Sequence, residues 1–161
     1  MNLERLFDMQ KVLDDRIKKE HQLEQTDVYE EKVLALLVEL GELANETRCF
    51  KYWSQKGPSE RAVILEEYVD GLHFILSLGL EKGWTDPMIA VVSTESSITT
   101  LFLHMYKCVI HMRKSATKET YNQLCTSFFI LGDALGFSQE EVVQAYVDKN
   151  EKNHERQNQG Y

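Results

Sequence analysis

The apolar positions of the chain recur with helical spacing almost throughout. One stripe near the start holds five apolar residues and one amide: Leu3, Leu6, Phe7, Gln10, Leu13 and Ile17. Residues three or four apart share a face of a helix, so this spacing predicts a helix over about residues 2–24. No alternating pattern that would indicate strands or hairpins appears in the sequence. The chain is therefore expected to be all-α.

Start and stop signals divide the next part of the chain into two helices. Asp27 and Glu30 resemble a capping box, which predicts that the second helix runs from there to about Phe50. The third helix is predicted to begin at Ser59 and to end near Gly83, because glycine commonly follows the last turn of a helix.

Three further helical segments follow. The fourth is predicted over about residues 87–113, with a break near 93–97, and the fifth over about 117–135. Ser138 and Glu141 form a capping box for a last helix over about 139–156. The predicted architecture is one bundle of helices.

Composition and charge narrow the range of functions. The 161 residues suit a single domain covering 1–161. A formal net charge of −8 argues against binding to polymeric nucleic acid. No signal peptide or apolar run of about 18 residues occurs, so no membrane segment is expected. Cys49, Cys108 and Cys125 are scattered and lack a CxxC spacing, which favours buried, reduced cysteines and a cytoplasmic protein.

Two acidic pairs carry the candidate chemistry: Glu39 with Glu42, and Glu67 with Asp70. Each pair is spaced i,i+3, so its two carboxylates lie side by side at the edge of an apolar helix face. If the two helices pack together, four carboxylates converge and need a cation, because they repel one another and lose water. An all-oxygen ligand set favours a hard ion such as Mg²⁺, which often holds substrate phosphates. We therefore expect a magnesium-dependent enzyme that acts on a nucleoside triphosphate.

Three alternatives remain for the acidic pairs. They could be exposed helix charges, or the acidic surface of a non-catalytic helical bundle that binds a partner protein. A di-iron bundle would require two Glu-x-x-His motifs, and only Asp70-Gly-Leu-His73 resembles one.

The full set of motifs resembles the dimeric all-α dUTPase family, part of the MazG-like superfamily of all-α NTP pyrophosphohydrolases. The matching segments are Glu39-x-x-Glu42, Glu67-Tyr-Val-Asp70-Gly-Leu-His73-Phe74, Lys149-x3-Asn153-x2-Arg156-Gln157, Gln10 and the aromatic, basic loop around Trp53. The resemblance implies a four-helix core of the all-α NTP pyrophosphatase type, a homodimer, and a small-molecule substrate, dUTP. A regulatory protein partner is left open.

The resemblance also implies hydrolysis of dUTP to dUMP and pyrophosphate, which keeps uracil out of DNA and supplies dUMP. Glu39, Glu42, Glu67 and Asp70 would bind two or three Mg²⁺ ions, with Mn²⁺ as a substitute. Direct attack by water is expected, because no Ser, Cys or His lies in a recognisable nucleophile setting. Glu39 or Glu42 would orient or deprotonate this water, and the sequence does not choose between them.

Phosphate binding is assigned to the last helix. Lys149, Asn153 and Arg156 are spaced i, i+4 and i+7 and so share one face. Arginine offers a two-pronged donor to phosphate, and lysine a mobile charge. Lys56 is a weaker candidate for the same role. The alternative is a basic, solvated helix end.

Base and sugar binding are assigned by the resemblance to Gln10, His73, Phe74 and Trp53. The amide of Gln10 can pair with both an N–H and a C=O of uracil. Phe74 and Trp53 could instead be packing residues. A related pyrophosphohydrolase that acts on dCTP or on several nucleotides is the closest alternative function.

Overall fold

The computed structural model describes residues 1–161 and contains six helices and no strand. The helices are α1 (Leu3–Glu20), α2 (Tyr29–Thr47), α3 (Arg61–Lys82), α4 (Ile98–Lys114), α5 (Lys118–Ala134) and α6 (Gln139–Asn158). The expectation of an all-α bundle is confirmed. None of the six helices combines the length and the apolar composition needed to cross a membrane.

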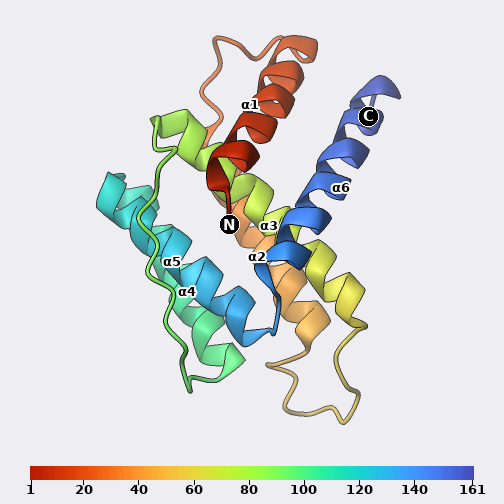
Figure 1. Ribbon diagram of the computed structural model, residues 1–161, viewed down its shortest axis with the longest axis vertical. Coiled ribbons are helices and arrows are strands. Elements are labelled where there is room, and N and C mark those ends of the chain that lie inside the picture. Colours follow the sequence, from red (N-terminus) through yellow and green to blue (C-terminus); the bar gives the residue numbers. More distant parts are fainter.

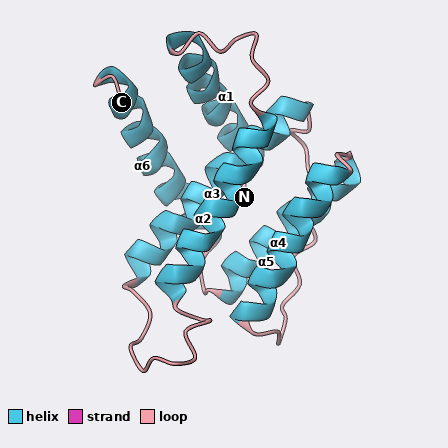
Figure 2. Cartoon of the chain, turned by 180° about the vertical axis from the view of Figure 1, so that it is seen from behind, coloured by secondary structure: helices cyan, strands magenta, loops and turns pink.

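Helix α3 lies at the centre of the bundle, where it contacts α1, α2, α5 and α6. Ten of its residues are buried, as expected for a helix that is apolar around most of its circumference. In Figure 1, α4 and α5 lie together on one flank, while α1 and α6 extend from the other side. Figure 2 shows the same arrangement from behind. One buried apolar cluster of 26 residues connects the helices.

Two glycines allow α3 and α5 to approach each other closely. A Cβ at Gly79 would lie 2.7 Å from Cζ of Tyr121, and a Cβ at Gly132 would lie 2.6 Å from Cζ of Tyr68. Each tyrosine hydroxyl donates a 2.9 Å hydrogen bond to a backbone carbonyl of the facing helix. The two tyrosines thus cross the interface in opposite directions and fix how α3 faces α5.

The predicted cap of the last helix is confirmed, whereas that of the second helix is wrong. Ser138 and Glu141 form a complete capping box at the start of α6. The Asp27 carboxylate instead accepts from the backbone N–H of Tyr29, the first residue of α2, and Val28 at the N-cap makes no side-chain bond. The Glu30 carboxylate accepts from Nε of Arg113 at 2.9 Å, so a partner on α4 replaces the local cap.

The predicted start of the fourth helix is also wrong, because residues 87–97 are not helical and α4 begins at Ile98. The backbone N–H groups of Met88 and Ala90 donate to side chains of α5 at 3.1 and 3.4 Å. These long-range bonds replace the local bonds of a helix. The Ser97 hydroxyl then accepts from a backbone N–H and caps α4.

The loop between α2 and α3 covers residues 48–60. Ser59, the predicted start of the third helix, donates its hydroxyl to the Glu46 carboxylate, and α3 begins two residues later. The loop exposes two aromatic rings, Tyr52 at 93% and Trp53 at 65% of their surface. In Figure 1 the loop lies at the lower end of α2 and α3, away from α1.

Candidate active site

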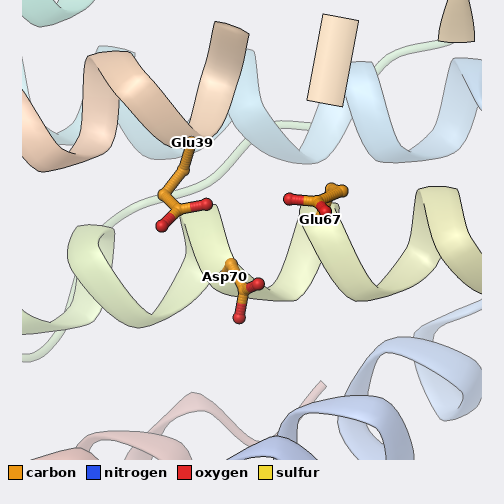
Figure 3. A group of neighbouring side chains, drawn as sticks. All are labelled: Glu39, Glu67 and Asp70. Atoms are coloured by element: carbon orange, nitrogen blue, oxygen red, sulfur yellow. The ribbon is translucent and has the colours of Figure 1, made fainter. Parts of the chain in front are cut away.

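Three carboxylates meet where α2 packs on α3. Glu39 points from α2 towards α3, and Glu67 and Asp70 come from successive turns of α3 (Figure 3). One oxygen of each lies within 4.8 Å of the others. Glu42 is exposed and lies outside this group. The convergence expected from the sequence is thus observed for three of the four carboxylates.

The acidic cluster (Glu39, Glu67 and Asp70) is electrostatically unfavourable by itself. Burial raises the pKa of Glu39 to about 8, with further contributions from the negative charges of Asp70 and Glu42. Burial raises the pKa of Glu67 to about 7, and the same two charges contribute. Oε2 of Glu39 and Oε2 of Glu67 are buried and have no hydrogen-bond partner. Buried polar atoms are normally paired, so the cluster requires a cation or protons.

The residues of the acidic cluster fit a hard divalent cation. Their available donors are carboxylate oxygens alone, with no histidine or cysteine among them. Such oxygens are the preferred ligands of Mg²⁺ and Ca²⁺, whereas softer metals favour nitrogen and sulfur. The two unpaired oxygens provide coordination capacity that no protein group uses.

Lys149 connects α6 to the acidic cluster. Its side chain is 9% exposed, and Nζ lies 2.9 Å from Oδ2 of Asp70 and 3.0 Å from Oε1 of Glu66. Burial lowers the pKa of Lys149, but the hydrogen bonds to the two carboxylates outweigh it and the pKa is raised. Burial likewise raises the pKa of Asp70, although Lys149 opposes this shift. Sequence reasoning missed Glu66, whose pKa Lys149 lowers.

A cavity of about 300 Å³ lies beside the acidic cluster. It is lined by residues of α1, α2, α3 and α6 and brings together eight of the predicted site residues: Gln10, Glu39, Asp70, His73, Phe74, Lys149, Asn153 and Arg156. The cavity therefore brings together candidate cation ligands, candidate phosphate-binding side chains and candidate base-binding groups. Trp53 and Lys56 do not line it, since both project from the loop between α2 and α3.

Gln10 and His73 form a buried network in the cavity wall. Oε1 of Gln10 accepts from the Tyr146 hydroxyl at 2.8 Å and faces Nδ1 of His73 at 2.6 Å, while its Nε2 donates to Asp14 at 2.8 Å. Burial lowers the pKa of His73 to about 3, so the ring is neutral. Because Gln10 presents an acceptor, the proton of His73 is assigned to Nδ1. Nε2 is then a buried acceptor without a partner.

Three further polar residues of the cavity were missed by sequence reasoning: Asp14, Lys32 and Ser77. Two of them could have been found from helical spacing. Lys32 precedes Glu39 by seven residues, and Ser77 follows Asp70 by seven, so each lies two turns away on the same helix face.

The fold and the site together define a class of protein: an all-α bundle with an acidic cluster that could hold a cation, beside a cavity lined by basic and polar side chains. The family model described as dUTPase matches residues 2–161, so the chain belongs to the all-α dUTPase family. Membership over almost the whole chain identifies it as a dUTP diphosphatase and confirms the resemblance seen in its motifs. Among curated proteins, no significant match was found.

Proposed function

We propose that this protein hydrolyses dUTP to dUMP and pyrophosphate in a Mg²⁺-dependent reaction with direct attack by water. The reaction would limit uracil in DNA and supply dUMP. The observation that carries the proposal is the pair of unpaired, buried oxygens of Glu39 and Glu67 beside a cavity that Lys149 and Arg156 also line. Such a site suits a substrate with several phosphates, whose charge the cation and the two basic residues neutralise together.

The proposed ligands of the cation are Glu39, Glu67 and Asp70, with Glu42 as a fourth carboxylate at the edge. Two or three Mg²⁺ ions fit this number of carboxylates, and Mn²⁺ is the proposed substitute. A bound divalent cation polarises phosphoryl oxygens and lowers the pKa of water. Glu39 is the preferred general base, because it lines the cavity and Glu42 does not.

The proposed phosphate-binding groups come from α6. Lys149, Asn153 and Arg156 line one side of the cavity and can donate to oxygens of the leaving pyrophosphate. Arg156 offers its two-pronged donor, and Lys149 would exchange a carboxylate partner for a phosphate oxygen.

The proposed nucleoside-binding groups come from α1 and α3. Phe74 is half-buried and provides an apolar wall for the sugar or base, and Gln10 and His73 add polar groups. Trp53 and Lys56 lie outside the cavity. Their proposed contacts with the nucleotide therefore require residues 48–60 to fold over it, or to reach the site of a second subunit.

We also propose a homodimer that forms through the apolar face of α2 and α4. Leu34 and Val38 of α2 are 63% and 51% exposed, and Leu103 and Ile110 of α4 are 68% and 38% exposed. Exposed apolar side chains on two neighbouring helices are typical of protein interfaces.

The test is pyrophosphate release from dUTP, UTP, dCTP, dTTP and dATP, with and without Mg²⁺. Magnesium-dependent release confined to dUTP is the expected result, and it should be lost in Asp70→Asn. Turnover of dCTP or of several nucleotides would retain the hydrolytic site but replace the proposed specificity. No turnover of any nucleotide would contradict the proposal and favour a non-catalytic acidic bundle.

A further inference from the structure

Asp14 and Lys32 place opposite charges side by side in the cavity wall. Nζ of Lys32 lies 3.6 Å from Oδ2 of Asp14, and their side chains are only 13% and 15% exposed. Lys32 lies seven residues from Glu39, or roughly 10 Å along a helix. A nucleotide whose phosphates contact the acidic cluster and α6 can thus extend its base to this pair.

Both members of the pair have unused hydrogen-bonding capacity. Oδ1 of Asp14 accepts from Gln10 at 2.8 Å, and Oδ2 accepts from Ser77 at 2.6 Å. Nζ of Lys32 donates to Glu81 at 2.6 Å. A carboxylate has about four lone-pair positions and an ammonium group has three N–H bonds, so each group can pair with a ligand as well. Gln10, Ser77 and Glu81 hold the two groups in place.

The pair offers one group that only accepts beside one that only donates. Uracil presents the opposite arrangement, with the N3–H donor next to the O4 acceptor. Cytosine presents an N3 acceptor next to an amino donor. The carboxylate would then face an acceptor and the ammonium group would face a donor, so neither could form a hydrogen bond. A site with fixed polar groups discriminates strongly against a ligand that leaves them unpaired.

We propose that Asp14 accepts from N3–H and Lys32 donates to O4 of uracil, so that this pair selects dUTP over dCTP. The inference rests on the proposed hydrolysis of dUTP and adds the residues that determine its base specificity. A second observation supports a polar ligand in this cavity. Nε2 of His73, a residue 6% exposed, is an acceptor without a partner in the same wall.

The main test compares kcat/KM for dUTP and dCTP in Asp14→Asn and Lys32→Gln. Each new amide has both a donor and an acceptor, so it can pair with either base. The preference for dUTP should fall by about tenfold to a hundredfold in each variant, mostly through slower turnover of dUTP. Lys11→Gln is the control, because Lys11 pairs with Asp15 on the same helix and does not line the cavity. It should keep the wild-type preference.

The binding of nucleoside monophosphates to the wild-type protein provides a second test. Calorimetry with Mg²⁺ should show that dUMP binds at least about tenfold more tightly than dCMP or 3-methyl-dUMP, which lacks the N3–H donor. Equal binding of 3-methyl-dUMP and dUMP would overturn the inference.

The outcomes separate the two proposals. If the wild type prefers dUTP and both folded variants keep that preference, the inference fails and the proposed function stands. Equal turnover of dUTP and dCTP by the wild type would overturn the inference and the proposed specificity, while the proposed hydrolysis of dUTP would stand. No turnover of any nucleotide would overturn both.

Discussion

Lys149 on α6 donates a 2.9 Å hydrogen bond to Oδ2 of Asp70, and this bond joins the candidate phosphate site to the acidic cluster. The sequence motifs assigned the two residues to separate roles. Their contact indicates that Lys149 supplies positive charge to the cluster before a substrate or cation is bound. Glu66, 3.0 Å from the same ammonium group, provides a second acceptor that keeps Lys149 in place.

Replacing Lys149 should weaken both the ion pair with Asp70 and the proposed binding of phosphate. In Lys149→Met, Asp70 loses its ionic partner and the phosphates lose a donor, so kcat/KM for dUTP should fall by about a hundredfold or more. Pyrophosphate release measures the loss. Lys152→Met is the matched control, since Lys152 is 58% exposed and approaches only Glu66, at 3.9 Å. Similar losses in the two variants would contradict a specific role for Lys149.

Removing one carboxylate of the acidic cluster should have opposite effects on activity and stability. Glu67→Gln removes a charge that lies among like charges, so the protein should melt at a higher temperature in the presence of a chelator. It also removes a proposed cation ligand, so magnesium-dependent turnover should fall by about a hundredfold or more. Glu60→Gln, at an exposed position just before α3, should change neither property.

Stability without divalent cations should decrease as the pH rises. The native pKa values of Glu39 and Glu67 are about 8 and about 7, above the ordinary value of 4.5. Between about pH 4.5 and 8 the native state therefore binds more protons than the unfolded chain, and the free energy of unfolding falls through this window. Urea unfolding in a chelator measures this slope. It should flatten in the double variant Glu39→Gln/Glu67→Gln, and added Mg²⁺ should restore stability at the alkaline end.

Close packing between α3 and α5 predicts a sharp contrast between two glycines. In Gly132→Ala the new Cβ would lie 2.6 Å from Cζ of Tyr68, so the helices must separate and the free energy of unfolding should fall by about 3 kcal/mol. Gly57→Ala meets no atom within 4 Å and should change stability by less than about 0.5 kcal/mol. Denaturant titration of both variants compares them directly.

If the dimer forms as proposed, an added charge should disrupt it only on the apolar face of α2 and α4. Val38→Glu places a carboxylate in the apolar face of α2 and α4, and sedimentation should show monomers. Val12→Glu is the control, because Val12 is similarly exposed, at 61%, but lies on α1. A wild-type protein that sediments as a monomer would overturn the proposed dimer.

The sequence by itself determined features that depend on nearest neighbours along a helix. The i,i+3 spacing of Glu67 and Asp70 and the capping box at Ser138 follow from local geometry, and both were predictable. The family motifs fall in the same category, because they are short runs with fixed spacing. The prediction of a helix over residues 87–97 was wrong, because bonds to side chains of α5 outweigh the local helical pattern.

Only the tertiary structure decided which side chains meet across helices. Glu39 joins the acidic cluster while Glu42, one turn away, remains exposed, because the rotation of α2 against α3 depends on the packing of the whole bundle. The pairing of Asp14 with Lys32 likewise joins α1 to α2. Helical periodicity limits which residues share a face, but the face that each helix presents to its neighbours is set by contacts between residues far apart in the chain.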